Sequence, residues 1–370
     1  MADRTDTEPI SLCVVIPNFN YACFIGDAIE SVLRSTRPAD EIMVIDDGST
    51  DDSAEVVVAF DEVELVRRSN SGQSDAVFHG AHRSRSDVVV LLDSDDTMSA
   101  DRLEWVAAAF DDPEVVMAWH PLRIDDGSGG DRGICPETRL PSGHLAERLG
   151  AGTVTTFALS SGLSIRRSAF EQLGPIPVEF RNAADSLLVR SVPFLGAVAA
   201  TDRALGTYRV HDASESRRGV GRSSDSMVRL LDRRLALAED ERRLVVQRAN
   251  EHRVQVDERA LGQMDGMYVD LALGRARLSA PSRRAAWNDA AAVDARFSTR
   301  PTVVSRILYT LSPKWMARAL LEIKLGSTSA SPARRVAAAL YWRLTTSDLR
   351  PARRRRSATA AESGEDAGSH

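Results

Sequence analysis

The sequence of 370 residues has little cysteine, almost no lysine and no long apolar run. Its cysteines, Cys13, Cys23 and Cys135, include no CxxC pair and no spacing typical of a metal site with histidine. This pattern excludes a zinc-finger type of protein and favours a reducing compartment. Lysine occurs only at Lys314 and Lys324, which we interpret as coding bias. No window contains about 18 consecutive apolar residues, so we expect no membrane-spanning helix.

The charge balance also limits the classes of function that we expect. A net charge of −6 gives no reason to expect nucleic-acid binding. The first residues, MADRTDTEPI, are acidic and polar and lack the basic and apolar stretches of a secretory signal. With 43% hydrophobic and 27% charged residues, the chain can bury a core. These features predict a cytoplasmic globular protein.

Short apolar runs alternate with helical patterns over about the first 120 residues. Strands are expected at 12–16, 41–45, 62–66, 87–92 and 114–119, and helices at 26–34, 53–60, 73–81 and 102–110. Ser99 is the expected N-cap of the last of these helices. The β-α-β order predicts an α/β fold with a mostly parallel sheet between helices. The polar motifs NFN, DDGSTDD, NSGQ and DSDD each follow a predicted strand, so they should converge on the carboxyl edge of the sheet, where ligands bind.

The amino-acid composition changes several times along the rest of the chain. Residues 121–152 are rich in Gly and Pro and predict an irregular excursion, and strand and helix signals return at 158–173. Arg, Glu, Leu and Ala at helical spacing then predict long helices after residue 227. We divide the chain into an N-terminal tail (1–9), an α/β domain (10–215), a linker (216–226), a helical region (227–348) and a disordered tail (349–370).

Three carboxylates, Asp93, Asp95 and Asp96, stand where a buried strand is expected to end. One interpretation is a solvated acidic turn. A second is a calcium loop, which Met98 disfavours because glycine is needed for the sharp turn at that position. A third is a D-x-D site that holds Mg²⁺ or Mn²⁺ against a diphosphate, since these ions typically bind through one or two carboxylates plus phosphates.

The order of four motifs decides between these alternatives: VVIPNFN (14–20), VIDDGSTDDS (44–53), NSGQSDA (70–76) and VVVLLDSDD (88–96). The series resembles the family 2 glycosyltransferases, the inverting group with the GT-A fold. The resemblance continues more loosely through 161–174, 183–190 and 205–214, and it covers about residues 10–215. It implies an enzyme that uses a nucleotide-diphosphate sugar (UDP, GDP or dTDP), a divalent metal and an acceptor hydroxyl.

The resemblance also implies roles for single residues. The donor nucleotide is expected to contact Pro17, Phe19, Asp47, Gly72, Gln73 and Asp93, and the metal is expected to bind Asp95, Asp96 and His211. Alternatives stay open for several of them: Asp47 as a turn-forming residue, Asp96 as a support behind the metal, and His211 as a structural histidine. Arg209 is expected either to contact the diphosphate or to pair with an acidic neighbour.

Inversion requires a base that takes the proton of the acceptor hydroxyl. The family pattern points to Asp185 in RNAADSLLVR, although Ala184 stands where the family often has Glu. The alternative role for Asp185 is a helix N-cap, and the alternative base is Glu179. Two rival functions remain open: a sugar-phosphate nucleotidyltransferase, which normally has a glycine-rich basic loop where this chain has PNFNYACF, and a degenerate member that acts as a scaffold.

The C-terminal third contains basic amphipathic segments at 303–325 and 332–344. They are expected either to pack on the catalytic domain or on another subunit, or to lie on the inner face of an anionic membrane, where many lipid-linked glycan acceptors reside. The resemblance points to cell-surface polysaccharide or another glycan as the product.

Overall fold

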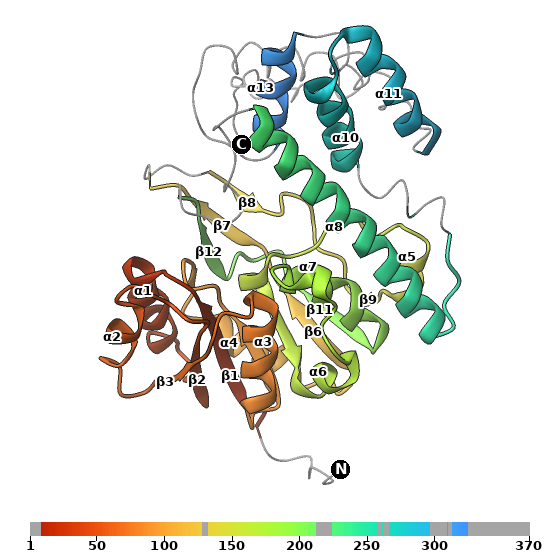
Figure 1. The fold of residues 1–370 in the computed structure, drawn as a ribbon. Coiled ribbons are helices and arrows are strands. Elements are labelled where there is room, and N and C mark those ends of the chain that lie inside the picture. The colour runs from red at the N-terminus through yellow and green to blue at the C-terminus, as the bar shows by residue number, and fades with distance from the viewer. Residues whose placement is uncertain are drawn as a thin grey trace, which may run out of the picture.

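The computed structural model describes residues 9–127, 132–211, 224–257, 261, 266–296, 309 and 313–324. A twisted sheet lies at the centre of the lower body in Figure 1, with helices on both faces. Its strands, in spatial order, are β3 (Glu64–Arg67), β2 (Glu41–Asp46), β1 (Leu12–Asn18), β4 (Val88–Leu91), β10 (Leu163–Arg166), β6 (Val115–Trp119), β11 (Ala197–Ala200) and β9 (Gly143–His144). The strands from β3 to β4 are mutually parallel, whereas β10 is antiparallel to both of its neighbours.

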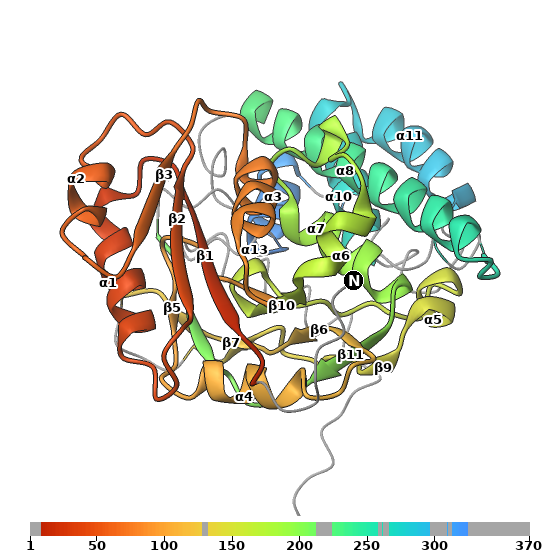
Figure 2. The ribbon, with the colours of Figure 1, turned by 90° about the horizontal axis from the view of Figure 1, so that it is seen from below.

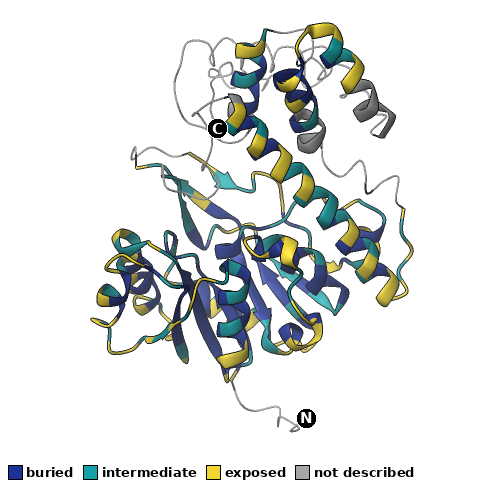
Figure 3. Cartoon of the chain, in the orientation of Figure 1, coloured by how far each residue is buried: buried dark blue, intermediate teal, exposed yellow. Residues whose placement is uncertain are grey.

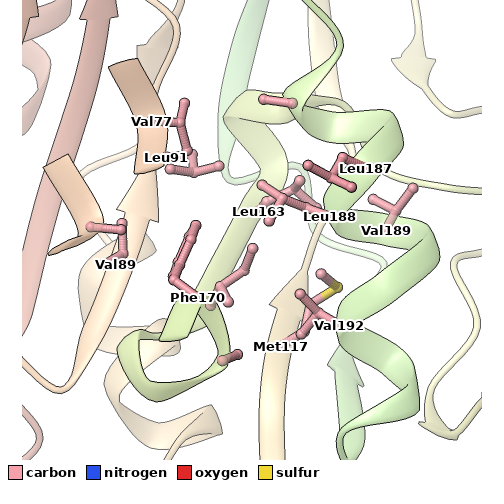
Figure 4. Packing of buried hydrophobic residues seen from close by; sticks show 14 of the residues in the cluster. Val77, Val89, Leu91, Met117, Leu163, Phe170, Leu187, Leu188, Val189 and Val192 are labelled. Atoms are coloured by element: carbon pink, nitrogen blue, oxygen red, sulfur yellow. The ribbon is translucent and has the colours of Figure 1, made fainter. Parts of the chain in front are cut away.

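Apolar side chains on both faces of β1 explain why helices cover the sheet on two sides. Leu12, Val14 and Ile16 belong to one core cluster, and Cys13 and Val15 belong to another. The first cluster packs against α1 (Ala22–Leu33), α2 (Ser53–Val57) and α4 (Arg102–Ala109). The second packs against α3 (Gln73–Arg83), α6 (Arg167–Leu173) and α7 (Ala184–Ser191), as Figures 2 and 4 show.

A second, smaller sheet stands beside the carboxyl edge of the first. It consists of β5 (Thr97–Met98), β12 (Gly206–Arg209), β7 (Leu122–Asp125) and β8 (Ile134–Cys135). Short elements complete this part of the chain: α5 (Ala146–Gly150), η1 (Ser160–Gly162), η2 (Val178–Phe180) and η3 (Val192–Phe194).

The structure confirms the predicted order of strands and helices up to residue 119 and corrects two details. Ser99 is not the N-cap of α4, because the helix begins after Asp101, and the Asp101 side chain makes no capping hydrogen bond. The segment 121–152 is less irregular than expected, since β7, β8, β9 and α5 lie within its described part.

The C-terminal helices are α8 (Ser224–Glu251), α10 (Gly266–Ser279), α11 (Arg283–Arg296) and α13 (Lys314–Lys324). Helix α8 begins within the predicted linker, most of which lies outside the described residues, as do 332–344 and the tail 349–370. Among the described helices, none is long and apolar enough to cross a membrane. The buried side of α13, with Ala317 and Leu321, packs into the cluster formed with α8 and α10. Its packing partners are therefore other C-terminal helices, whereas packing on the catalytic domain or on another subunit was expected. Contact with a membrane surface stays a prediction.

Helix α8 links the sheet domain to the other C-terminal helices. Leu244 belongs to the core cluster of the sheet, whereas Leu231 packs with the cluster of α10 and α13. Glu241 forms an ion pair of 2.8 Å with Arg190 on α7, and both side chains are almost fully buried. Figure 3 shows α8 with alternating buried and exposed patches along its length. The long helix is therefore part of the core of the sheet domain.

Replacing Leu244 with alanine should destabilise the protein by roughly 2–4 kcal/mol, because it leaves a cavity where α8 meets the sheet domain. Val58→Ala is the matched control, since Val58 is 67% exposed and its loss should change stability by no more than about 0.5 kcal/mol. Urea unfolding measures both. Equal effects would show that α8 does not share the core.

Candidate active site

A cavity of about 480 Å³ opens at the carboxyl end of the parallel strands, where the sequence motifs were expected to meet. Its lining comes from several loops that are far apart in the sequence: Pro17, Asn18, Phe19, Tyr21, Asp47, Asn70, Gly72, Gln73, Ala76, Asp93, Ser94, Asp95, Leu159, Ser160, Asn182, Asp185 and Tyr208. The predicted nucleotide residues are all present. Of the three predicted metal ligands, only Asp95 lies in the lining.

The loop after β2 is fixed by its own carboxylates. Asp47 accepts hydrogen bonds from the backbone N–H groups of Ser71, at 2.8 Å, and Gly72, at 2.7 Å. Asp46 accepts one from the N–H of Ser49, at 3.2 Å, and so braces the turn. Asp47 thus ties the end of β2 to the loop that leads into α3.

Gly72 is required by the geometry of that loop. Its φ of +101° is a conformation that essentially only glycine adopts, and a Cβ there would stand 2.4 Å from Cγ of Arg181. The next residue, Gln73, begins α3 and donates from Nε2 to Asp93 at 3.1 Å. The close packing of Gly72 against Arg181 therefore precedes a glutamine whose amide lies beside Asp93, the first carboxylate of the acidic turn.

The acidic turn is held from several sides. The N–H of Asp93 donates to Oγ of Ser161 at 2.9 Å. Burial, and then repulsion by Asp95 and Asp185, raise the pKa of Asp93 to about 7. Asp96 points inward: it is 2% exposed and accepts a hydrogen bond from the backbone N–H of Arg209 at 2.9 Å. Burial, together with repulsion by Asp93 and Asp95, raises its pKa well above the usual range.

Asp95 and His211 face each other, with Nε2 of the histidine 3.0 Å from a carboxylate oxygen. The imidazole ring is held by Phe24, at a centroid distance of 4.4 Å, and by Tyr21, at 5.8 Å. Within the described residues, no group of three or more His, Cys, Asp or Glu side chains is arranged to hold a metal. The carboxylate nevertheless suits Mg²⁺ or Mn²⁺ when a diphosphate supplies further oxygens, and neutral imidazole is a common metal ligand in proteins.

The predicted base, Asp185, lies in the lining of the same cavity. It is the second residue of α7, whose N-cap is Ala183, so the structure does not support the N-cap alternative. Burial raises the pKa of Asp185, while a hydrogen bond from Ser186 N–H and the charge of Arg190 lower it. Ala184 is fully buried in the core. Glu179 lies exposed on η2 and is not among the lining residues.

Comparison with known proteins shows to which family the chain belongs. A family model described as "Glycosyl transferase family 2" matches residues 13–174. An uncharacterized glycosyltransferase of Nostoc sp. is 32% identical over 224 residues, which cover 58% of this chain and 70% of that protein. The chain belongs to glycosyl transferase family 2.

Two further proteins are similar to the chain, one in sequence and one in fold. A putative teichuronic acid biosynthesis glycosyltransferase, TuaG of Bacillus subtilis, is 30% identical over 105 residues, which cover 27% of this chain and 41% of the relative. The solved structure of the mannosyltransferase PcManGT from Pyrobaculum calidifontis in complex with GDP-Man and Mn²⁺ superposes with a TM-score of 0.50. It is 16% identical and covers 93% of this chain and 89% of its own, which confirms the predicted GT-A fold.

The sequence did not predict several of the residues that line the cavity. Asn70, Ser160, Asn182 and Tyr208 lie in its lining, and each stands beside or within a quoted motif without matching a role in it. Arg209 was left between two alternatives, and the structure pairs its guanidinium with Asp27 at 3.0 Å. The only indication in the sequence was that the missed residues lie next to or within the matched segments.

Gly72→Ala should destabilise the protein more than Gly174→Ala. The backbone of both glycines lies in a region that excludes other residues, so each substitution costs roughly 1–3 kcal/mol in strain. Only at Gly72 does the added methyl also collide with Arg181, since nothing lies within 4 Å of the corresponding position at Gly174. Denaturant unfolding of the two variants compares these costs. Equal losses would contradict the close approach of Arg181.

Proposed function

We propose that this glycosyltransferase moves a sugar from a nucleotide-diphosphate sugar to an acceptor hydroxyl with inversion at the anomeric carbon. The observation that carries the proposal is that Asp47, Asp93, Asp95 and Asp185 line one cavity although they come from separate segments of the chain. Family membership favours this function over the nucleotidyltransferase alternative.

The nucleotide is assigned to the side of the cavity formed by β1 and β2. Phe19 is partly exposed there, and it lines the cavity together with Pro17, so the two supply apolar surface for a base. Both carboxylate oxygens of Asp47 already accept backbone hydrogen bonds, and each keeps a further acceptor site. Asp47 is thus held in one orientation and can accept a bond from a base imide. UDP, GDP and dTDP are the candidate nucleotides.

Asp95 and His211 would hold Mg²⁺ or Mn²⁺, an assignment supported by their 3.0 Å approach. The bound metal would act as a Lewis acid that stabilises charge on the departing diphosphate. Asp96 is assigned a supporting role, because its carboxylate is buried and bonded to the backbone of Arg209. Gln73 orients Asp93 toward the donor through their hydrogen bond. The solved relative that contains GDP-Man and Mn²⁺ is consistent with this assignment.

Asp185 would act as the base. The acceptor oxygen forms a bond to the anomeric carbon as the bond from that carbon to the diphosphate breaks, and the Asp185 carboxylate takes the hydroxyl proton. Its raised pKa makes it a stronger base than an exposed aspartate. The name of the Bacillus relative supports a role in polysaccharide biosynthesis, with a glycan or lipid-linked acceptor.

The metal assignment predicts that UDP, GDP or dTDP raises the melting temperature only when Mg²⁺ or Mn²⁺ is present. Asp95→Asn should abolish most of that shift, because it removes a carboxylate from the metal. Asp61→Asn is the control, since Asp61 lies on the exposed surface away from the cavity lining. Nucleotide binding that is unchanged by EDTA would contradict the metal assignment.

The base assignment predicts that Asp185→Asn lowers transfer by roughly 10² to 10⁴ while donor binding is nearly unchanged. The base must be ionised, so wild-type transfer should rise as pH increases through the raised pKa of Asp185. The asparagine variant should lose that pH dependence. The assay follows release of nucleotide diphosphate with an identified acceptor, and Glu179→Gln is the control. Near-normal transfer by Asp185→Asn would move the search for the base elsewhere.

A further inference from the structure

Two side-chain amides lie close together in the wall of the cavity. Gln73 and Asn182 both line it, although they are 109 residues apart in the sequence. Oδ1 of Asn182 accepts the backbone N–H of Gln73 at 3.4 Å, and Nε2 of Gln73 donates to Asp93 at 3.1 Å. Among the residues that the structure describes, Nδ2 of Asn182 and Oε1 of Gln73 make no hydrogen bond. One amide donor and one amide acceptor are therefore left for a ligand in the cavity.

The partners of the two amides fix which atoms are left. A backbone N–H can only donate, so the atom of Asn182 that meets it must be the carbonyl oxygen. An ionised carboxylate can only accept, so the atom of Gln73 that meets Asp93 must be the amide nitrogen. The remaining atoms are Nδ2 of Asn182, which can only donate, and Oε1 of Gln73, which can only accept.

The chain around Asn182 is bound to the start of α3. The carbonyl of Arg181 accepts the N–H of Ser74 at 3.0 Å, and Nε of Arg181 donates to the carbonyl of Ser71 at 2.7 Å. A Cβ at Gly72 would stand 2.8 Å from Oδ1 of Asn182, so this side chain lies directly against the loop. The two amides are therefore held together before any ligand binds.

The amide pair lies where the proposed reaction needs the sugar. The anomeric carbon is bonded to the diphosphate, which is assigned to Asp95, and it is attacked by the hydroxyl that Asp185 is assigned to deprotonate. The transferred sugar must therefore lie between these two carboxylates. Asp93 is close to both, because burial, and then their charges, raise its pKa. Gln73 contacts Asp93, and Asn182 stands three residues before Asp185 in the chain.

The chemistry of the two free atoms suits hydroxyl groups. A hydroxyl has one donor and two acceptor lone pairs, so sugar hydroxyls can accept from Nδ2 of Asn182 and donate to Oε1 of Gln73. An ionised carboxylate on the sugar would give Oε1 no donor, and it would be repelled by Asp93 and Asp185. The cavity wall therefore fits an uncharged hexose.

We propose that Asn182 is a specificity residue that donates from Nδ2 to a hydroxyl of the transferred sugar, and that this sugar is an uncharged hexose. Oε1 of Gln73 accepts from the same hydroxyl or from the adjacent one. The role of Asn182 rests on the proposed function, because it requires a nucleotide-diphosphate sugar in the cavity. It extends that function from the nucleotide and the metal to the sugar itself.

The test compares nucleotide sugars with their own nucleotide diphosphates by isothermal titration calorimetry in the presence of Mn²⁺. The pairs are UDP-glucose with UDP, GDP-mannose with GDP and dTDP-glucose with dTDP. For each pair, the dissociation constant of the nucleotide sugar divided by that of the nucleotide measures the effect of the sugar. For the nucleotide sugar that the wild type binds most tightly, Asn182→Ala should raise this ratio roughly 3- to 10-fold, since one hydrogen bond to the sugar is lost.

Asn182→Asp separates recognition of the sugar from a structural role. Aspartate keeps an oxygen for the N–H of Gln73 but has no N–H to donate, so it should raise the ratio as Asn182→Ala does. A residue that only fastened the start of α3 would tolerate this change. The added charge acts on the diphosphate of both ligands and largely cancels in the ratio. Asn182 is exposed, so we expect both variants to fold.

Asn250→Ala is the matched control, because Asn250 is exposed on α8 and lies outside the cavity lining, and it should leave the ratio unchanged. The role of Asn182 is overturned if either of its variants has the wild-type ratio for all three pairs. Tighter binding of UDP-glucuronate than of UDP-glucose would overturn the uncharged sugar.

The two levels of the hypothesis fail in different ways. If the wild type binds no nucleotide diphosphate in Mn²⁺, the proposed function fails and the role of Asn182 fails with it. If the nucleotide binds with metal and both Asn182 variants keep the wild-type ratio, the proposed function stands and Asn182 has no part in recognising the sugar.

Discussion

The mutual repulsion of carboxylates at the carboxyl end of β4 is the constraint on which the rest of the structure depends. Asp93, Asp95 and Asp185 lie around one cavity, and burial with repulsion raises the pKa of Asp93 to about 7. Such a cluster persists only where its surroundings hold it in place. Here β4 pairs on both sides, with β1 and β10, so the turn that follows it has no freedom to relax. The repulsion that remains would favour the cation that we propose at Asp95.

Polar contacts at the opposite edge of the sheet set how the strands that carry the site pair. Since β1 is apolar on both faces, its hydrophobic pattern cannot by itself specify the pairing register. Side chains at the amino ends do so instead. Oδ2 of Asp87 accepts hydrogen bonds from the N–H and hydroxyl of Ser11, and Asp40 accepts one from the N–H of Leu12. With this register, Asn18 stands opposite Asp46 at the carboxyl edge, and the loops that carry the site begin level with one another.

The sequence was informative where structure is set locally. Apolar runs and turn residues predicted β1 to β4 and placed their motifs at one edge. The insertion of β10 between β4 and β6 could not be predicted, because strand order depends on pairing between distant segments. The burial of Arg102 could not be predicted for another reason: an arginine in a helical pattern is expected to face solvent, and only tertiary packing reveals that this one does not. Asp185 was found only through the family resemblance.

The C-terminal helices, which no motif identified, contribute to the site through charge. Burial raises the pKa of Asp185, and the guanidinium of Arg190, five residues along the chain, opposes that rise. Arg190 is in turn paired with Glu241 of α8 at 2.8 Å, and both are almost fully buried. A buried arginine that lacked this partner would act more strongly on Asp185, since little solvent screens it. Helix α8 thus supplies the ion-pair partner of the arginine that acts on the proposed base, and it packs with the core of the sheet domain.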